Sequence, residues 1–525
     1  MDDCDVLVVG GGHNALVCAG YLAKAGYRVL VVERRGRIGG AVVTEEIVPG
    51  YRFDLGGSAH ILIHHTPVVA DLELERYGLE YLDLDPLFFA PFLDGTSLTV
   101  YRDVDRTCES IARISPRDAE AYRRFIDYWS PLAEDVVATF NAPPTAGSML
   151  RHLVAKRPYP GHDRAEDVRT ILGTYGQFVE QHFSSPQVRA LVGWMAAQSG
   201  PPPTEPISAP FAMWHPMYHV SGIKRPRGGS GMLTQALARM IEAHGGRIIT
   251  GQPAREFIVR EGRVRGILTQ DGQSYLARRA VVSGMHVHTT FALLGDQAPE
   301  RARRLIRNAR IGNGFGFVVR HAVSELPQYR CQRAPGQGLD EAHTGLQLIC
   351  PSLEHINAAY GDYLAGRPSA DPCLVVMTFS AVDDSLAPPG KHVMFIWAQY
   401  YPYQLAGGQS WDAIAEREAD RLLDTLAAYA PNVKDSVTDR LIETPEYLER
   451  KLGILRGNVM HIEMSIDQMF MLRPALSMSQ YRGPLKGLYL TGASTHPGGG
   501  IMGSAGRNAA TILLRDLSRW PIPRV

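Results

Sequence analysis

The sequence has no excess of charge of either sign, because 54 Lys and Arg residues balance 54 Asp and Glu residues over 525 positions. Proteins that bind nucleic acid usually carry an excess of positive charge, so we expect no nucleic-acid partner. Cysteine is also scarce. The six cysteines are scattered without a C-x-x-C pair, which argues against a disulfide framework, a zinc ribbon and a dithiol redox centre. Reduced thiols of this kind favour a cytoplasmic protein.

Long apolar runs are missing as well. The one candidate, residues 6–23 (VLVVGGGHNALVCAGYLA), follows acidic residues and is interrupted by the three consecutive glycines 10–12, whereas a secretory signal has a basic start and an unbroken apolar stretch. No other run reaches the roughly 18 apolar residues of a membrane-spanning helix. We therefore expect a soluble protein, or one bound to a membrane face.

The beginning of the chain has the pattern of a β-α-β unit. Residues 6–9 form a short apolar run typical of a buried parallel strand. Residues 14–25 have helical character, and Gly26 offers a left-handed stop. The stretch YRVLVVE then predicts a second buried strand that ends at Glu33.

A dinucleotide-binding fingerprint lies within this unit. Gly10, Gly12 and Ala15 occupy the positions of the pattern G-x-G-x-x-G/A. Gly10 permits the tight turn, Gly12 lets backbone approach a pyrophosphate, and Ala15 allows close packing of helix on strand. Glu33 can accept hydrogen bonds from ribose hydroxyls, and its charge would repel a 2′-phosphate, which argues against NADP. The unit therefore predicts a dinucleotide site at the N-terminus of the helix.

The segment after Glu33 favours FAD over NAD. It begins at Arg34, which we include in the expected cofactor site, and it carries two further glycine pairs, Gly39–Gly40 and Gly56–Gly57. A typical nicotinamide domain would pass directly into another helix. This detour indicates backbone that follows a larger, extended cofactor.

Three segments resemble the phytoene-desaturase-like FAD oxidoreductases, which are relatives of the amine oxidases. They are residues 6–57, residues 225–259 (RPRGGSGMLTQALARMIEAHGGRIITGQPAREFIV) and residues 487–510 (GLYLTGASTHPGGGIMGSAGRNAA). The resemblance implies an α/β fold with a Rossmann-like FAD-binding domain of the amine-oxidase-like (GR2) type, interleaved with an α+β substrate domain. We expect the FAD domain at 1–85, 222–300 and 480–525. The substrate domain is expected at 86–221 and 301–479, with a helical, membrane-facing insertion.

The resemblance also assigns the C-terminal glycine cluster to FAD. It implies that Gly57 and Ala254 contact the cofactor, and that Gly492, Gly500, Ile501 and Met502 meet the flavin ring. Backbone N–H groups and the dipole of the last helix would stabilise the negative charge of the reduced ring. Family members commonly have alanine and proline at positions 499 and 502, and valine at 254, where this chain has glycine, methionine and alanine. Because backbone makes these contacts, we expect FAD binding to persist.

Three stretches rich in Met, aromatic and small residues suit a long apolar ligand: 195–203, 209–222 and 457–474. Ordinary core packing would give the same composition. The stretches also resemble those of carotenoid 3′,4′-desaturases, and this likeness implies an enzyme that introduces a C-3′,4′ double bond into an acyclic or monocyclic carotenoid. The polyene would be met at a membrane surface, through a transient peripheral contact.

The catalytic side chains are less well specified by the sequence. Glu463 and Asp467 are candidates for the group that removes a proton from the substrate. His215, His219 and His461 match no metal signature, so we assign no metal. Since there is one dinucleotide fingerprint, oxygen or a quinone is the expected electron acceptor.

Two other functions remain open. An amine oxidase would use the same architecture, although the absence of cysteine after position 373 excludes a C-terminal cysteinyl-flavin link. A non-enzymatic escort protein that retains FAD for structure is the second alternative.

Overall fold

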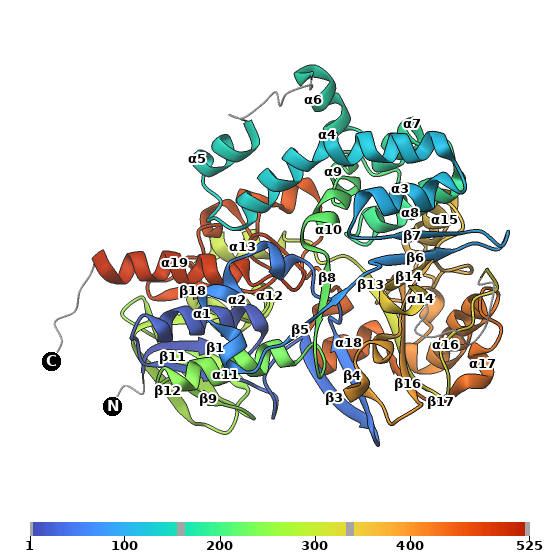
Figure 1. The fold of residues 1–525 in the computed structure, drawn as a ribbon. Coiled ribbons are helices and arrows are strands. Elements are labelled where there is room, and N and C mark those ends of the chain that lie inside the picture. Colours follow the sequence, from blue (N-terminus) through green and yellow to red (C-terminus); the bar gives the residue numbers. More distant parts are fainter. Residues whose placement is uncertain (1–3, 155–162, 332–340, 520–525) are drawn as a thin grey trace.

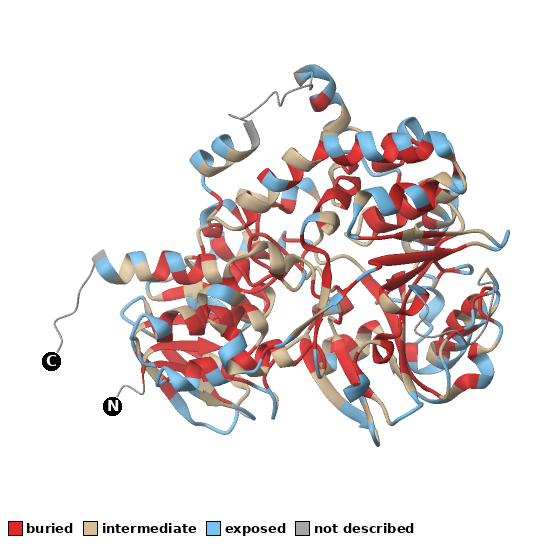
Figure 2. Ribbon diagram, viewed as in Figure 1, coloured by how far each residue is buried: buried red, intermediate tan, exposed pale blue. Residues whose placement is uncertain are grey.

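The computed structural model describes residues 4–154, 163–331 and 341–519. Its frame is a pair of seven-stranded sheets, one beside the two termini and one on the opposite side of the molecule (Figure 1). Figure 2 shows that both sheets and the inner faces of their helices are buried. The α/β fold with mixed sheets agrees with the expected class.

The first sheet contains the β-α-β unit predicted at the start of the chain. In it, β12, β1, β2 and β9 run parallel, β18 lies parallel on β12, and β10 and β11 add an antiparallel edge. The bounds along the sheet are β10 (Ala254–Arg260), β11 (Arg263–Thr269), β12 (Ser274–Ser283), β1 (Cys4–Val9), β2 (Val29–Val32) and β9 (Arg247–Ile249), with β18 at Leu488–Leu490. The continuous apolar run of β1 is explained by layers that cover both faces of the sheet.

Helices from the two ends and the middle of the chain cover one face of this sheet. They are α1 (His13–Lys24), α11 (Met232–Ala243) and α19 (Ser504–Arg519), which share one core with β1 and β2. The predicted left-handed stop of α1 is confirmed, because Gly26 has φ +85°. The opposite face is covered by the β10–β11 hairpin together with α12 (Val287–Leu294) and α13 (Glu300–Arg307).

The second sheet lies on the side of the molecule opposite the two termini (Figure 1). Its order is β17 (Val437–Glu443), β13 (Gly314–Val323), β16 (His392–Pro402), β15 (Leu374–Met377), β14 (Leu346–Ile349), β6 (Phe88–Pro91) and β7 (Ser97–Val100). The runs of β-branched and aromatic residues at 373–384 and 392–403 are typical of strands; the first contains β15 and the second forms β16. One face packs against α16 (Trp411–Ala427), and the other packs against a helical layer.

That helical layer comes from the segment between β7 and β8. Its main helices are α3 (Val104–Ala112), α4 (Pro116–Phe140), α7 (Tyr175–His182), α8 (Pro186–Ala197) and α10 (His215–Ser221). Ser115 followed by Pro116 is a sequence signal for a helix start, and α4 begins there: the Ser115 hydroxyl accepts a hydrogen bond from the N–H of Asp118 at 3.2 Å. No helix of the described residues is long and apolar enough to cross a bilayer.

Two pairs of antiparallel strands lie between the two large sheets (Figure 1). β3 (Val42–Val48) pairs with β4 (Tyr51–Gly56), and β5 (Tyr81–Leu84) pairs with β8 (Ile223–Pro226). The chain leaves the first half after β5 and returns at β8. The expected domain bounds stay a prediction. The remaining helices are α2 (Val68–Asp71), α5 (Ala146–Met149), α6 (Arg164–Leu172), α9 (Ala209–Ala212), α14 (Glu341–Thr344), α15 (Leu353–Leu364), α17 (Val433–Ser436) and α18 (Pro445–Leu452).

Candidate functional site

The N-terminal fingerprint forms a tight turn between β1 and α1. Gly10 has φ +98°, a conformation that favours glycine, and its N–H donates to the carbonyl of Val32 at 2.8 Å. Gly12 caps α1 without any side-chain hydrogen bond. A Cβ added to Gly12 would meet no heavy atom within 4 Å, so this backbone faces open space. The positive end of the α1 dipole is therefore free to bind a phosphate.

Glu33 lies beside this turn, directly after β2, and is 6% exposed. One carboxylate oxygen accepts from the N–H of Gly11 at 2.7 Å, and the other accepts from the N–H of Arg35 at 2.8 Å. The buried carboxylate thus fixes the backbone of the fingerprint. Its predicted bond to a ribose stays a prediction.

The second glycine pair packs directly against the first turn. Gly39 and Gly40 have φ +120° and +60°, and the N–H of Gly39 donates to the carbonyl of Gly11 at 2.8 Å. A Cβ on Gly40 would lie 3.0 Å from the Cα of Gly12. Gly39 and Gly40 therefore line the fingerprint with backbone alone, as a cofactor cradle requires.

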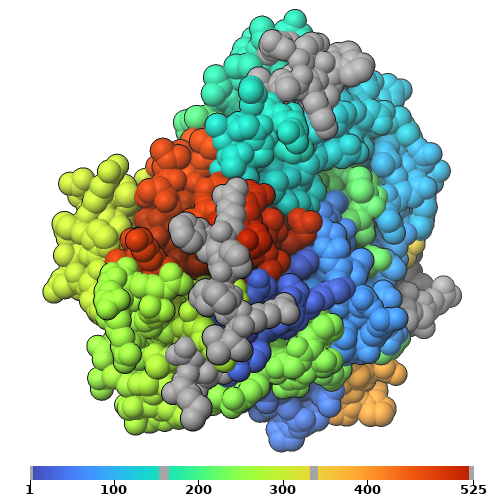
Figure 3. All heavy atoms as spheres, turned by 90° about the vertical axis from the view of Figure 1, so that its left-hand side faces the viewer, coloured from blue at the N-terminus to red at the C-terminus, as the bar shows by residue number. Residues whose placement is uncertain are grey.

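The C-terminal glycine cluster meets the N-terminal one. His13, the first residue of α1, is hydrogen-bonded to the backbone of Gly500, and burial lowers the pKa of its imidazole to about 4. A Cβ on Gly57 would come within 2.7 Å of the Cδ1 of Ile501. Met502 follows and is buried. In Figure 3 the red C-terminal surface accordingly lies against the blue N-terminal surface. The sequence prediction did not include His13, although its place within the fingerprint, between Gly12 and Ala15, was the available signal.

Several buried polar atoms beside these turns have no partner. They include the side-chain oxygens of Asn14 and Thr491 and the Nδ1 of His496. Buried polar groups are nearly always hydrogen-bonded, so these atoms fit the edges of a polar cofactor. A free helix N-terminus, a buried acid and a glycine cradle make up the donor and acceptor set that FAD requires. Gly492 lies just after β18, at the start of the C-terminal glycine turn, and has φ +100°, a conformation that favours glycine.

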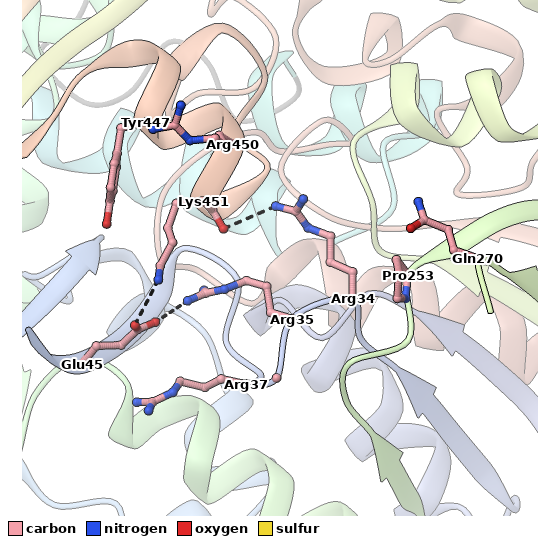
Figure 4. Close-up of a pocket in the computed structure, with 10 residues that line it drawn as sticks. Arg34, Arg35, Arg37, Glu45, Pro253, Gln270, Tyr447, Arg450 and Lys451 are labelled. Atoms are coloured by element: carbon pink, nitrogen blue, oxygen red, sulfur yellow. Dashed lines mark hydrogen bonds and ion pairs between the residues drawn. The ribbon is translucent and has the colours of Figure 1, made fainter. Parts of the chain in front are cut away.

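Arg34 and Ala254 lie at the outer end of this path. Ala254 begins β10 and pairs with Thr269 on β11. Arg34 lines a surface pocket of about 730 Å³ together with Pro253, and its guanidinium donates to the carbonyl of Lys451 at 3.4 Å (Figure 4). The direct role predicted for Arg34 in cofactor binding stays a prediction.

A larger cavity of about 890 Å³ lies between the helical layer and the loop that follows α18. The three Met- and aromatic-rich stretches noted in the sequence converge on its wall. Representative lining residues from these stretches are Ser199, Pro201, Phe211, Met213, Trp214, Met217, Met460, Met464 and Phe470. The cavity is therefore large and mostly apolar.

The inner wall of the cavity touches the C-terminal glycine turn. A Cβ on Gly498 would lie 2.9 Å from the sulfur of Met464, and one on Gly499 would lie 2.7 Å from the Cα of Met460. Both methionines also line the cavity. The cavity wall and the turn at which the flavin ring is expected are therefore in direct contact.

Arg310 occupies the exposed rim of the cavity and binds both acids predicted as proton acceptors. It donates to Glu463 at 2.9 Å and, through two nitrogens, to Asp467 at 2.9 Å. Hydrogen bonding to Arg310 lowers the pKa of Asp467. Pairing with Arg310 makes Asp467 a weaker base, and both carboxylates lie at the solvent-facing rim. The predicted role of Glu463 and Asp467 as proton acceptors stays a prediction. Sequence reasoning missed Arg310, which lies on a distant segment.

The three histidines considered in the sequence take part in packing networks. The Tyr122 hydroxyl lies 3.4 Å from Nδ1 of His215 and 2.8 Å from Nε2 of His219. Burial lowers the pKa of His215 to about 3. The ring of His461 stacks on that of His286, with centroids 5.4 Å apart. Within the described ranges, no cluster of three or more metal-ligating side chains is found.

Comparisons with known proteins agree with this arrangement. Residues 16–320 match the family described as flavin containing amine oxidoreductase. The chain is 34% identical to rat pyridine nucleotide-disulfide oxidoreductase domain-containing protein 2, over 98% of this chain and 94% of the rat protein. It is 29% identical to one of the subunits of the limonene dehydrogenase of Castellaniella defragrans, over 98% and 95%. It is 26% identical to carotenoid 3,4-desaturase of Haloarcula japonica, over 98% and 99%.

A solved structure shows the same fold. It is an oxidoreductase from Methanosarcina mazei, with a TM-score of 0.62 and 17% identity, covering 97% of this chain and 99% of the other. The fold, the glycine cradle and the family match agree on the cofactor, which is FAD. The chain therefore belongs to the flavin-containing amine oxidoreductase family and is an FAD-dependent oxidoreductase.

Proposed function

We propose that the protein dehydrogenates a long apolar polyene, as a carotenoid 3′,4′-desaturase that adds a double bond to an acyclic or monocyclic carotenoid. The observation that carries this proposal is the apolar cavity of about 890 Å³ whose methionine wall touches the C-terminal glycine turn. FAD supplies the acceptor for a hydride. Relatives named as a carotenoid 3,4-desaturase and a limonene dehydrogenase support an isoprenoid hydrocarbon as substrate.

The residues of the chain would bind, orient and shield this substrate. Phe211, Met213 and Trp214 offer apolar surface that can adapt to a methyl-branched chain. On the side nearest the glycine turn, the rings of Phe140 and Phe470 pack against His496, with centroids 5.9 and 6.1 Å apart. A substrate so enclosed displaces water from the reacting carbons.

The charges of the cavity argue against a polar amine as substrate. Its lining contains three carboxylates, those of Glu205, Glu463 and Asp467. Two of them, Glu463 and Asp467, share one ion-pair partner, Arg310, at the rim. Glu205 is exposed to solvent. These carboxylates lie at the exposed rim, whereas the wall beside the glycine turn carries methionine and aromatic side chains, so that wall favours an apolar group over a charged ammonium group.

A peripheral membrane contact is also part of the proposal. Leu364 and Ile466 line the cavity and are 69% and 49% exposed. Leu172, at the end of α6 in the helical insertion, is 56% exposed. Apolar side chains at the mouth of an apolar cavity support transfer of a substrate from the bilayer at a cytoplasmic membrane face. Part of the insertion, residues 155–162, lies outside the described residues.

The proposal is tested by expressing the gene in a host that accumulates lycopene-type or 1′-hydroxylated γ-carotene-type precursors. We expect a red-shifted pigment that is two hydrogens lighter by mass. Ala133→Trp, which fills the cavity from α4, should retain FAD but lose more than about nine-tenths of product formation, since overpacking blocks the site. Ala243→Trp, at an exposed position on α11, is the matched control and should retain product formation. Unchanged pigments with folded, flavin-loaded protein would favour the amine-oxidase or escort alternatives.

Electron transfer gives a separate prediction. One dinucleotide fingerprint is present and it is assigned to FAD, so oxygen or a quinone is the proposed acceptor and not a bound nicotinamide. Mixing the yellow protein with NADPH in the absence of air should leave the flavin absorbance unchanged over minutes. Fast stoichiometric bleaching by NADPH would refute this part of the proposal.

A further inference from the structure

Arg473 is a fully buried cation without a carboxylate partner. It lies between the loop that lines the substrate cavity and the turn that follows β18, and its exposed fraction is 0%. Its guanidinium donates only to backbone carbonyls, those of Met460, Ile462, Glu463, Gln468 and Ala493, at 2.6 to 3.4 Å. Its Nε has no partner. Carbonyl dipoles bind this charge, but they do not cancel it.

The other fully buried arginines of the described chain differ in this respect. Arg225 pairs with Asp54 at 2.9 Å, and Arg320 pairs with Glu443 at 3.0 Å. A buried cation without an opposite charge is costly. Although burial lowers the pKa of Arg473 to about 9, its guanidinium stays charged at pH 7. The fold therefore maintains one uncompensated positive charge at this place.

The surroundings of Arg473 carry no negative charge either. The rings of His286, His461 and His496 are buried, and the charge of Arg473 contributes to lowering the pKa of each, so all three are neutral at pH 7. The nearby carboxylate of Glu463 points to Arg310 instead. These groups surround the position at which the flavin is expected.

Arg473 lies directly behind the C-terminal glycine turn. A Cβ added to Gly498 would lie 3.6 Å from the Cζ of its guanidinium. Arg473 also donates to the carbonyl of Ala493, the residue after Gly492, at 2.8 Å. The charge thus acts at the segment that is expected to contact the flavin ring.

We propose that Arg473 is a charge-stabilising residue that favours the reduced, negatively charged flavin over the oxidised one. Its field adds to that of the α19 N-terminus, because both place positive charge at the C-terminal glycine turn. A charge fixed in advance in a dry site needs no reorganisation when electrons arrive. The inference rests on the FAD cofactor and is independent of the polyene substrate.

The matching experiment compares Arg473→Met and Arg473→Lys in the flavin-loaded protein at pH 7. Sulfite, which adds to flavin and leaves a negative ring, is the probe. For Arg473→Met we expect sulfite affinity to fall at least tenfold and the midpoint potential to fall by about 30 mV per tenfold change, by the two-electron relation. Arg473→Lys retains the positive charge but cannot make all the hydrogen bonds of the guanidinium to the backbone carbonyls. This variant should therefore have a lower Tm, while its sulfite affinity stays within about threefold of wild type.

Controls separate charge from structure. Glu418→Gln removes a buried charge on α16, on the far face of the second sheet, and it should leave sulfite affinity within about twofold of wild type. A purely structural role of Arg473 would lower stability in both Arg473 variants and leave sulfite affinity and potential unchanged, which would overturn the proposal. If Arg473→Met does not fold, the neutral variant Arg473→Gln, which can still donate to the backbone carbonyls, replaces it: its sulfite affinity should fall at least tenfold, and an affinity within about threefold of wild type would refute the inference.

Discussion

Gly12→Val is expected to give a folded protein that has lost its yellow colour. The backbone of Gly12 faces open space at the N-terminus of α1, and a branched side chain there would occupy the place of the pyrophosphate. We expect FAD affinity to fall at least about 100-fold, or about 2.7 kcal/mol. Flavin absorbance per mole of purified protein measures the effect, and circular dichroism reports whether the fold is retained.

The same substitution at Gly361 is the control for Gly12→Val. Gly361 lies on α15, is exposed, and a Cβ there would also meet nothing within 4 Å. Gly361→Val should therefore remain yellow. A Gly12→Val protein that binds FAD with wild-type stoichiometry would show that the cofactor does not follow the fingerprint.

Gly506→Leu is expected to destabilise the protein and release FAD together. A Cβ on Gly506 would lie 2.1 Å from the carbonyl oxygen of Asn14 and 2.9 Å from the Cβ of Val17, so α19 cannot keep its distance from α1. Overpacking of this kind lowers the free energy of unfolding by about 3 kcal/mol. The N-terminus of α1 is expected to bind the pyrophosphate of FAD, and the turn before α19 is expected to contact the flavin ring. Separation of the two helices would therefore weaken FAD binding. Thermal unfolding followed by flavin fluorescence should show a lower Tm and early release of FAD.

Thr511→Leu is the matched control on the same helix. Thr511 is exposed on α19, and a larger side chain there meets solvent. Its Tm should stay near that of wild type. If Gly506→Leu also unfolds at the wild-type temperature with its flavin bound, the close packing of α1 and α19 does not hold the site together.

Local patterns in the sequence were sufficient to predict the nucleotide-binding half. The strand at 6–9, the turn at Gly10–Gly12 and the helix that follows are determined by residues close together in the chain, so periodicity and glycine spacing report them. Gly39 and Gly40 were found for the same reason. The strongly apolar strands β15 and β16 of the second sheet were also visible as β-branched and aromatic runs.

The chemistry of the cavity could not be predicted in this way. Glu463 and Asp467 were chosen as acids in an apolar stretch, but their pairing with Arg310 depends on how that stretch folds against the start of β13. Arg473 was missed because a lone arginine carries no local signal, and His13 was missed because the fingerprint specifies only its glycine and alanine positions. Their contacts reach to Gly500 and Ala493, and only the folded chain reveals them.

The central claim is that an apolar polyene passes electrons to FAD in the cavity beside the C-terminal glycine turn. It is tested most directly by mixing purified, flavin-loaded protein without oxygen with a detergent-solubilised lycopene-type or 1′-hydroxylated γ-carotene-type precursor, and recording the flavin absorbance and the mass of the pigment. We predict bleaching of the flavin with formation of an equal amount of a product two hydrogens lighter, and no bleaching by putrescine. Bleaching by putrescine, with every polyene left unchanged, would contradict the account.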